Sequence, residues 1–445
     1  MGMCYVACMT EGLRRFLLLG FVVFMLPIAH LRSQAPSPVA TPEAGDSTDP
    51  DSPYENIHVL ARAMQLIRQD YVDGAKTSFR DLTYSALRGM LAELDPHSSF
   101  MDPRDFKGMQ EDTKSEFGGL GVTVTTKNSA LTIISVADGT PGFEAGLQPG
   151  DQIRKINETS TERMTMSDSV EMLRGEPGEK VTLTVLRPAS REVLEFTVAR
   201  AVIKVPSIYD AMILPTEANS DRKIGYVRMT QFNEPTASEL AAALDRLEGE
   251  GMEALVLDVR FNPGGLLNSA VDVCSQFLPP NTQVVYTEGR SPNREYFTSK
   301  TPGGVRKYPL AVLVNNSSAS GSEIVAGALK DLGRAIVVGE TTFGKGSVQS
   351  VVALPDGSAM RFTTAKYFTP GRKPIHEYGV SPDIRATMTM DEEAALFQAR
   401  RKREFPFKET AGGLKAADPQ LDRAVDALTG VLMYSDRVET VSKMN

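Results

Sequence analysis

The sequence predicts a multidomain α/β protein, in which a mixed-sheet α/β core follows a small β-rich module and helical segments lie at both ends. Three observations indicate this class. The chain has 445 residues, which is too long for one hydrophobic core. Apolar strand-like runs alternate with helical runs over residues 201–385. Short alternating strands separated by glycine turns fill residues 117–200.

The first 35 residues are typical of an export signal or a membrane anchor. Arg14 and Arg15 precede an apolar run, Phe16 to Ala29, that is shorter than the ~20 residues needed to span a bilayer, which favours a signal. No clean cleavage site follows, so an uncleaved anchor stays open. We therefore expect a protein that is exported to the periplasm, either free or anchored to the inner membrane. Residues 36–53, rich in Pro, Ser, Thr and Asp, are expected to be a disordered linker.

Helical segments are predicted on both sides of the β-rich module and core. Residues 54–116 form an N-terminal helical region, with two helices that end where Asp95-Pro96 interrupts the pattern. His97 follows this stop, so we expect it to have a structural hydrogen-bonding role. Residues 386–445 carry two amphipathic stretches, Glu392–Arg403 and Pro419–Leu432, which suit packing or contacts between copies of the chain.

The composition excludes several functions. A net charge of −8 argues against nucleic-acid binding, because no basic stripe is present to neutralise phosphates. The three cysteines, Cys4, Cys8 and Cys274, cannot form a disulfide framework. Cys274 lies in a helical pattern and is expected to be a small buried side chain. Cysteines and histidines show no metal-ligand spacing, so no metal site is expected.

Residues 117–200 begin with the glycine-rich run Gly118–Gly121. Glycines let consecutive backbone N–H groups turn toward one point, and such a nest can bind a carboxylate. This stretch resembles a PDZ domain, with Gly119, Leu120, Gly121 and Val122 as the carboxylate-binding loop and AGLQPGDQIRKIN as the hairpin region. The short alternating strands, single helix and glycine turns of this module predict a small, partly open β-barrel, and the strand after the glycine run offers an edge to which a peptide can add. The alternative is that the glycines only form a tight turn. Arg174, at the end of the helix in this module, is expected to be a surface cation; coupling to the active site is the weaker alternative.

The core shows strands alternating with helices. The run ALVLDVR is nearly all apolar, as expected for a strand buried on both faces, and FNPGGLL then turns into a helix at Leu266–Leu278. Another helix is expected at Pro235–Leu247. The remaining strands are KIGYVRM, VVYTE, LAVLVNN, AIVVGE, SVQSVVAL and AMRFTTAKYF. This order predicts a mixed sheet flanked by helices.

The most informative stretch is NNSSASGSEIVAGALKD, where an apolar run turns into a helix at Ser320. A serine at a strand-to-helix turn exposes its hydroxyl beside convergent N–H groups. Lys345 follows 25 residues later between two glycines, with apolar neighbours that could lower its pKa enough for it to act as a base. Gln349, four residues further along a strand, points to the same face as Lys345.

Other polar residues near this turn are weaker candidates. Ser317 and Ser318 precede the turn, and Ser322 falls within the first helical turn. Glu323 is expected to be an acid favoured by the helix dipole. Asp258 is expected to pair with Arg260 or a backbone group. None of the four histidines has an acid in a triad-like arrangement; they are His30, His58, His97 and His376.

The blocks SASGSEIVAGALKD, GETTFGKGSVQ and LDVRFNPGGLL, behind a PDZ-like module, resemble the carboxyl-terminal processing peptidases, or tail-specific proteases, over residues 54–385. The resemblance implies a crotonase/ClpP-like serine peptidase core. It implies that Ser320 is the nucleophile, Lys345 the general base and Gln349 the residue that orients the lysine. It also implies an oxyanion hole made by the N–H of Gly321 and the backbone of Gly264 or Gly265. The family commonly has alanine at the position of Gly321, an equally small residue that also supplies an N–H.

The resemblance further implies an endopeptidase that recognises protein C-termini through its PDZ domain and cleaves exported or envelope proteins through an acyl-enzyme. No metal, ATP or other cofactor is expected. A helical-repeat adaptor or activator is a candidate partner, and we expect a homo-oligomer with contacts at the terminal helices. Two alternatives differ in class: a non-catalytic PDZ-type scaffold that recruits exported proteins, and a crotonase-like enzyme acting on a thioester.

Overall fold

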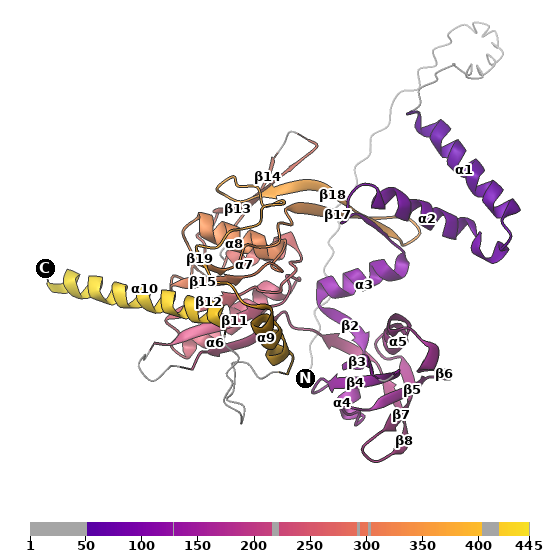
Figure 1. Cartoon of the computed structure of the whole chain (residues 1–445), viewed down its shortest axis with the longest axis horizontal. Helices are drawn as coiled ribbons and strands as arrows, with labels where there is room; N and C mark the ends of the chain where they lie inside the picture. The colour runs from indigo at the N-terminus through magenta and orange to yellow at the C-terminus, as the bar shows by residue number, and fades with distance from the viewer. Residues whose placement is uncertain are drawn as a thin grey trace, which may run out of the picture. The chain divides into compact units, whose positions relative to one another are not determined.

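The computed structural model describes residues 51–127, 129–215, 222–291, 294–300, 304–402 and 418–444 (Figure 1). The expected export segment and nearly all of the expected linker lie outside these residues. The chain divides into two compact units, residues 1–74 and 75–445, which are described separately below. Over the described ranges, no helix is both long enough and apolar enough to cross a membrane.

The expected N-terminal helices are present. In the first unit, α1 (Pro53–Asp70) begins with a proline, which suits the first helical position. A short 3-10 turn, η1 (Gly74–Lys76), follows. In the second unit, α2 (Phe79–Ala92) is capped by the Ser78 hydroxyl, and α3 (Pro103–Lys114) by the Asp102 carboxylate. Between them lies β1 (Ser99–Met101), a strand that was not predicted.

The β-rich module is an open sheet and contains no closed barrel in its described residues. Its strand order is β3-β4-β5-β7-β8, with β6 paired to β5. Helix α5 (Met166–Leu173) begins with a capping box formed by Thr165 and Asp168. Because β3 ends the order, one of its edges has no neighbouring strand in the described sheet. The elements are β2 (Glu116–Gly119), β3 (Val122–Lys127), β4 (Ala130–Val136), α4 (Pro141–Glu144), β5 (Gln152–Ile156), β6 (Thr159–Ser160), η2 (Thr161–Arg163), β7 (Lys180–Arg187) and β8 (Glu192–Ala199).

The α/β core contains the expected mixed sheet, in the order β10-β11-β12-β15-β16-β19. All neighbouring pairs are parallel except β10 with β11. The strands are β10 (Ile208–Ile213), β11 (Ile224–Met229), β12 (Ala254–Asp258), β15 (Leu310–Val314), β16 (Ile336–Gly339) and β19 (Ile384–Arg385). Strands β12 and β15 are buried along their whole length, as their apolar runs predict.

Helices cover both faces of this sheet. On one face, α6 (Thr236–Gly249), α7 (Leu267–Cys274) and α8 (Gly321–Asp331) contribute to the largest buried apolar cluster. On the other, α9 (Met390–Lys402) and α10 (Pro419–Met444) close a second cluster. The predicted C-terminal stretches are therefore helices that pack on the core, and α10 packs against β12, β15 and β16 (Figure 1).

A second, antiparallel sheet contains three strands that we had expected in the first sheet: β13, β17 and β18. Its order is β1-β18-β13-β14, and β17 pairs with β18. The strands are β13 (Gln283–Gly289), β14 (Arg294–Thr298), β17 (Ser347–Ala353) and β18 (Ala359–Phe368). The remaining strand, β9 (Ala201–Lys204), pairs with β2. Lys345 therefore lies in the loop just before β17 of the antiparallel sheet, whereas Ser320 lies in the turn after β15 of the mixed sheet.

Candidate active site

Ser320 lies at a strained turn between β15 and α8. Its backbone has φ +52° and ψ −112°, a conformation that costs a non-glycine residue free energy and that is typical of a nucleophile held at a sharp turn. Asn262 supports this turn, since its carbonyl accepts hydrogen bonds from Ala319 N at 3.0 Å and Ser322 Oγ at 2.9 Å. The turn is therefore fixed by the loop that follows β12.

The neighbouring serines have other partners. Ser318 and Ser322 are fully buried. Their hydroxyls donate to the carbonyls of Val259 at 2.8 Å and Asn262 at 2.9 Å. Ser317 is exposed, and its hydroxyl donates to Asn316 Oδ1 at 3.1 Å. Ser320 alone among these four serines combines the strained turn with partial exposure.

Glu323 connects the serine turn to the lysine loop, a role that the sequence did not suggest. Its side chain is fully buried, and one oxygen, Oε2, accepts hydrogen bonds from Ser320 N at 2.8 Å and Lys345 N at 2.9 Å. The other oxygen, Oε1, accepts from Thr342 Oγ1 at 2.6 Å and Gly344 N at 2.7 Å. Burial raises the pKa of this carboxyl, while the hydrogen bonds oppose the rise.

Lys345 is half-buried, and its pKa is lowered. Burial is the main cause, and the positive charge of Arg361 adds to it; Asp95 and Glu323 work in the opposite direction. The Lys345 carbonyl accepts a hydrogen bond from the buried Tyr367 hydroxyl. In the described part of the chain, no hydrogen bond joins Lys345 Nζ to Ser320 Oγ. Glu323 therefore holds the two backbones close to each other, but the two side chains are not hydrogen-bonded.

Tyr367 is a second residue that the sequence did not single out. Its hydroxyl lies beside the Ser320 side chain as well as the Lys345 carbonyl. Burial raises the pKa of Tyr367 well above its ordinary value, so the phenol stays neutral and can donate a hydrogen bond. The sequence did not single out Tyr367, because an aromatic residue in a strand such as β18 is ordinary and carries no mark of a functional role.

Gln349 lies near Lys345 in the chain but bonds elsewhere in this conformation. Its amide nitrogen donates to Thr363 Oγ1 at 2.8 Å and to Ser347 Oγ at 3.2 Å. Its Oε1 atom is buried without a hydrogen-bond partner. A register shift between Val348 and Gln349 interrupts the regular alternation from which we expected a shared face with Lys345.

The turn after α2 also lies near Lys345. Asp95 Oδ1 accepts from the backbone N–H groups of His97 at 2.7 Å and Ser98 at 2.9 Å, which fixes the turn. Its pKa is lowered: burial opposes the shift, but hydrogen bonds from Thr363 and this turn outweigh it. The pKa of the His97 imidazole is also lowered, mainly by burial and then by the Lys345 charge.

The glycine turn after β12 lies directly against Ser320. A Cβ atom placed on Gly264 would lie 2.6 Å from Ser320 Cβ and 2.7 Å from Gly321 N. The Gly264 N–H itself donates to Asn262 Oδ1 at 2.9 Å. Within the described residues, the N–H groups of Gly265 and Gly321 have no hydrogen-bond acceptor. Of the three expected oxyanion donors, only the N–H groups of Gly265 and Gly321 are therefore free to bind an oxyanion, because that of Gly264 is already bonded.

The four residues of the expected carboxylate loop line one groove of the β-rich module. Gly119, Leu120, Gly121 and Val122 face α5 across a cavity of about 220 Å³. The carbonyls of Leu120 and Gly121 accept hydrogen bonds from Gly142 N and Ala137 N, both at 2.8 Å, which fixes the loop. Strand β3, with its open edge, forms part of the same groove. This geometry suits the addition of an extended peptide.

Arg174 lines the same groove. Its guanidinium lies 4.4 Å from the centre of the Phe117 ring and 3.6 Å from the Glu111 carboxylate of α3. These contacts hold a half-buried cation beside the carboxylate loop. The default expectation of a simple surface cation therefore understates its packing.

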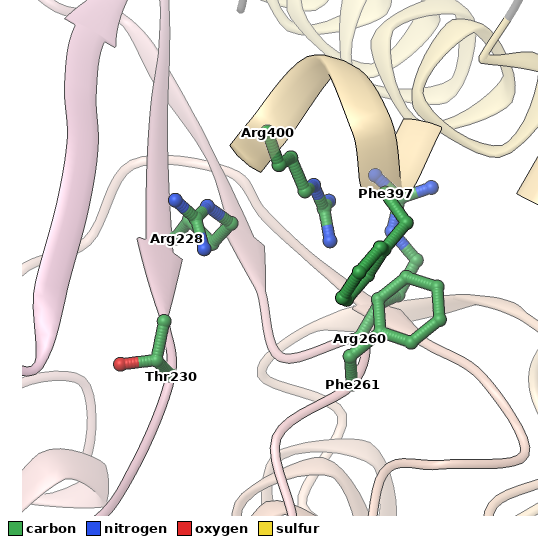
Figure 2. A pocket seen from close by; sticks show the side chains of 6 residues that line it. All are labelled: Arg228, Thr230, Arg260, Phe261, Phe397 and Arg400. Atoms are coloured by element: carbon green, nitrogen blue, oxygen red, sulfur yellow. The ribbon is translucent and has the colours of Figure 1, made fainter. Parts of the chain in front are cut away.

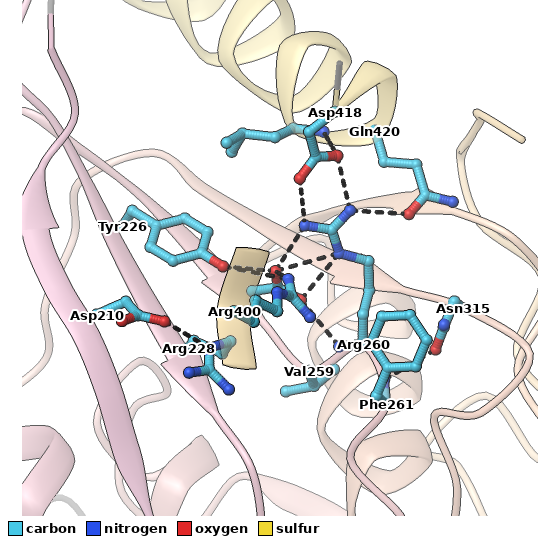
Figure 3. Close-up of polar contacts among 12 residues, drawn as sticks. Asp210, Tyr226, Arg228, Val259, Arg260, Phe261, Asn315, Arg400, Asp418 and Gln420 are labelled. Atoms are coloured by element: carbon cyan, nitrogen blue, oxygen red, sulfur yellow. Dashed lines mark hydrogen bonds and ion pairs between the residues drawn. The ribbon is translucent and has the colours of Figure 1, made fainter. Parts of the chain in front are cut away.

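Asp258 is a structural acid, as expected. Burial opposes its ionisation, but the charges of Arg260 and Arg400 hold its pKa well below the ordinary range. It accepts hydrogen bonds from Tyr226 Oη at 2.7 Å and Arg260 Nη2 at 2.7 Å (Figure 3). Asp418 pairs with the other side of Arg260, at 2.7 Å and 2.8 Å (Figure 3). The network therefore joins β12 to the start of α10.

Cys274 is fully buried, and burial raises its pKa, so it is an inert apolar side chain as expected. In the described ranges, no group of His, Cys, Asp and Glu side chains is arranged to hold a metal ion.

Comparison with known families matches two parts of the chain. Residues 223–386 match peptidase family S41, and residues 132–187 match the PDZ domain. The PDZ match begins after the Gly119–Val122 loop, so it does not cover the expected carboxylate-binding residues.

Curated relatives match over most of the chain. A carboxy-terminal-processing protease of Bartonella bacilliformis is 38% identical over 74% of this chain and 75% of its own length. A carboxyl-terminal-processing protease of Synechocystis sp. is 35% identical over 85% of this chain and 84% of its own. The solved photosystem II D1 C-terminal processing protease is 30% identical, covering 74% of this chain and 92% of its own, with a TM-score of 0.43.

Proposed function

Because the chain belongs to the carboxyl-terminal processing proteases, serine-type endopeptidases of family S41 that carry a PDZ domain, we propose that it cuts proteins with a Ser320–Lys345 dyad. The observation that carries this proposal is the shared Glu323 oxygen, which accepts hydrogen bonds from the N–H groups of both residues. Two segments far apart in the sequence are thereby held within reach of each other.

The proposed chemistry needs a neutral lysine. Burial and the Arg361 charge lower the pKa of Lys345, which raises the fraction of neutral amine at a given pH. Lys345 Nζ takes the proton as Ser320 Oγ attacks the peptide carbonyl carbon. The resulting ammonium then gives the proton to the leaving amine. Water, deprotonated by the same amine, hydrolyses the Ser320 ester and returns both residues to their starting state.

The backbone of Gly265 and Gly321 is the proposed oxyanion hole. Their N–H groups have no acceptor among the described residues, and the glycine turn lies against Ser320. Donors aimed at the developing negative charge are worth about 3 kcal/mol each in barrier height. Gly264 contributes through its close approach to Ser320 and not through its own N–H, which is bonded to Asn262.

The conformation described here is a proposed resting form. Ser320 Oγ and Lys345 Nζ are not hydrogen-bonded in the described structure, and Gln349 bonds Thr363 and Ser347 instead of orienting the lysine. We assign Gln349 the orienting role in the active form, where its unpaired Oε1 atom can accept a hydrogen bond from Lys345 Nζ. Such a form keeps the peptidase inactive until substrate binds.

The Gly119–Val122 loop is the proposed site for the substrate C-terminus. Its groove combines a fixed glycine-rich loop, the open edge of β3 and the half-buried cation of Arg174. A bound peptide extends the sheet, and its carboxylate lies at the loop. Docking of this end then leads to engagement of the dyad.

The cellular setting is also a proposal. The apolar segment Phe16–Ala29 supports export to the periplasm, with exported or envelope proteins as substrates. Exposed apolar residues on α10, including Tyr434 and Val438, make this helix a candidate for contacts between copies or with a helical-repeat adaptor.

Turnover of an unstructured protein with an apolar C-terminus tests the function. Ser320→Ala and Lys345→Ala should lower kcat by at least about 1000-fold, and Ser317→Ala, a matched exposed serine, should not. Lys345→Arg should be as inactive as Lys345→Ala, because guanidinium does not give up its proton. An active Lys345→Arg enzyme would contradict the dyad. A scaffold would bind the same C-terminal peptide without cutting it, in wild type as in Ser320→Ala.

A further inference from the structure

A cavity of about 350 Å³ lies at the carboxyl ends of β11 and β12, on the sheet face that α9 and α10 cover (Figure 2). Its lining consists of three arginines, one threonine and two phenylalanines: Arg228, Arg260, Arg400, Thr230, Phe261 and Phe397. The volume is that of a small-molecule site. Nothing in the proposed peptidase chemistry uses this cavity.

Among the residues that the structure describes, the cavity wall is cationic and carries no acid. Three carboxylates bond these arginines, but none of them lines the cavity; they are Asp210, Asp258 and Asp418. Figure 2 shows the Arg228 and Arg400 side chains at the same cavity, the first from β11 and the second from α9. Each of these two cations is already paired with a carboxylate, Arg228 with Asp210 and Arg400 with Asp258, so an anion in the cavity would be a second partner for both.

Arg400 is the most informative member of this lining. Its side chain is only 6% exposed, and its Nη2 atom donates to Asp258, which already bonds Tyr226 and Arg260. Its Nε atom is buried without a hydrogen-bond partner. A buried, charged donor without an acceptor is costly, but this atom is closed to solvent and so to a ligand in the cavity. The donor that Arg400 can offer to a ligand is its Nη1 atom, which has no hydrogen-bond partner among the described residues.

Arg228 offers further donors. Its Nε atom donates to Asp210 Oδ2 at 2.6 Å, and this is the one hydrogen bond of the Arg228 side chain among the residues that the structure describes. Asp210 has φ +51° at a register shift in β10, so the strand is distorted where it holds the arginine. Arg228 is thereby fixed with its terminal nitrogens available.

The opposite wall is aromatic. The Phe261 and Phe397 rings lie edge to face, with centres 6.3 Å apart, and Phe397 is 54% exposed. The Arg400 guanidinium lies 5.5 Å from the centre of the Phe261 ring. One side of the cavity thus suits an oxyanion and the other an apolar group.

We propose that this cavity binds an organic carboxylate that carries an apolar group, with its oxygens on Arg228 and Arg400 and its apolar part against Phe261 and Phe397. Two sources share this chemistry, a free small carboxylic acid and the C-terminal residue of a short peptide. The site is distinct from the Gly119–Val122 groove, which holds an extended peptide by its main chain.

Calorimetric titration of the full-length Ser320→Ala chain tests the proposal without turnover. The probes are 3-phenylpropionate, the isosteric neutral 3-phenylpropanamide, and inorganic phosphate. We expect the carboxylate to bind at least about tenfold more tightly than the amide, as the loss of a charge-assisted pair predicts. Phosphate should bind more weakly, because it leaves the phenylalanines uncovered. Equal binding of all three probes, or no binding of 3-phenylpropionate at 10 mM or below (on the order of the weakest useful affinity), would overturn the proposal.

Two variants locate the site. Arg400→Gln should weaken 3-phenylpropionate at least about tenfold, and Arg423→Gln, an exposed arginine of α10, should not. Thr230→Glu supplies a carboxylate from the protein itself and should abolish binding while the circular dichroism spectrum stays unchanged. This second variant decides the matter if Arg400→Gln does not fold. Wild-type affinity in both would overturn the assignment.

A peptide arm separates the two sources. Gly-Gly-Phe and its C-terminal amide are titrated into the same protein and into Thr230→Glu. Binding of the free acid that exceeds that of 3-phenylpropionate and is lost in Thr230→Glu assigns a peptide C-terminus. Weaker binding of the peptide than of 3-phenylpropionate assigns a free small acid. Peptide binding unaffected by Thr230→Glu belongs to the β3 groove and counts against a peptide in this cavity.

Discussion

The backbone N–H groups of Ser320 and Lys345 donate to one and the same oxygen atom, Oε2 of Glu323, at 2.8 Å and 2.9 Å. The two residues therefore share a fixed point although their side chains are not hydrogen-bonded in the described structure. This arrangement separates two requirements of the proposed dyad. The backbone geometry is set in advance by a buried acid, and the side-chain contact remains to be made.

Replacing Glu323 should disable catalysis without disabling peptide capture. Glu323→Ala leaves the N–H groups of Ser320, Gly344 and Lys345 without their acceptor. We expect kcat to fall about 100-fold, with a loss of roughly 1–3 kcal/mol in the free energy of unfolding for each buried donor left unpaired. Steady-state kinetics and chemical denaturation measure the two effects.

Glu340→Gln is the control, since this acid also has a raised pKa but makes no side-chain hydrogen bond in the described chain. If Glu323→Ala raised KM and left kcat unchanged, Glu323 would not position the dyad.

The acidic limb of the pH–rate profile should report Lys345. The neutral amine is the active form, so kcat/KM rises as the pH rises through its pKa, and the lowered pKa places this rise below that of a free lysine. Arg361 lowers this pKa, so Arg361→Gln should move the limb to higher pH. Asp95 raises it, so Asp95→Asn should move the limb to lower pH.

Each substitution is a control for the other, because the two are expected to shift the acidic limb in opposite directions. Shifts in the same direction, or no shift in either variant, would show that another group limits the rate.

The two glycines beside Ser320 should differ in tolerance. Gly264 has φ +99°, and an added Cβ would lie 2.6 Å from Ser320 Cβ, so Gly264→Ala should abolish turnover. At Gly321 the added Cβ would meet the Phe232 ring at 2.9 Å, a contact that a small ring movement relieves. Gly321→Ala should therefore keep at least about a tenth of the wild-type kcat. Turnover rates of the two purified variants measure this contrast, and an inactive Gly321→Ala beside an active Gly264→Ala would reverse the proposed geometry.

Peptide capture should depend on the shape of the Gly119–Val122 loop. Gly121 has φ +76°, and an added Cβ would lie 2.3 Å from the Thr140 side chain, so Gly121→Ala must shift the loop. We expect at least about tenfold weaker binding of a C-terminal peptide, measured by fluorescence anisotropy in the Ser320→Ala chain.

Gly178→Ala is the matched control, because Gly178 also has a positive φ, +92°, but open space around the added atom. Equal peptide affinity in the two variants would remove the loop from the proposed site.

The buried Asp258 network should stabilise the packing of α9 and α10. Asp258→Asn leaves Arg260 and Arg400 partly uncompensated, and breaking a buried ion pair in this way costs about 3 kcal/mol or more. The pKa of Asp258 is lowered in the folded state, so its contribution is present above the ordinary carboxyl pKa and is lost as the pH falls below it. Urea denaturation at two pH values measures the loss, and a variant as stable as wild type at neutral pH would contradict this role.

Much of the fold could be predicted because its elements carry their own patterns. The apolar runs of β12 and β15 predicted buried parallel strands, and the amphipathic stretch from Pro419 predicted α10. Short strands such as β1 and β19 were missed, since two or three residues carry no periodicity. The separation of β13, β17 and β18 into a second sheet depends on pairing between distant segments, which local patterns do not encode.

The site divides in the same way. The local turn chemistry of Ser320 and Lys345 was enough to predict them as a candidate dyad. Glu323 was read as a helix-dipole acid, because its partners Thr342, Gly344 and Lys345 lie about 20 residues away and meet it only in the folded chain. The sequence also could not predict that the Gly264 N–H is already hydrogen-bonded, because its acceptor is the side-chain oxygen of Asn262, whose orientation is set only in the folded chain.

The most direct test of the dyad is the rate at which a fluorophosphonate labels the full-length protein, followed by intact mass and peptide mapping across a range of pH. The reaction is run with and without a C-terminal peptide, because the described conformation does not engage the dyad. We expect a single label on Ser320, faster with peptide, at a rate that rises with pH and is lost in Lys345→Ala. Labelling of Ser317, or equal rates in wild type and Lys345→Ala, would contradict the Ser320–Lys345 assignment.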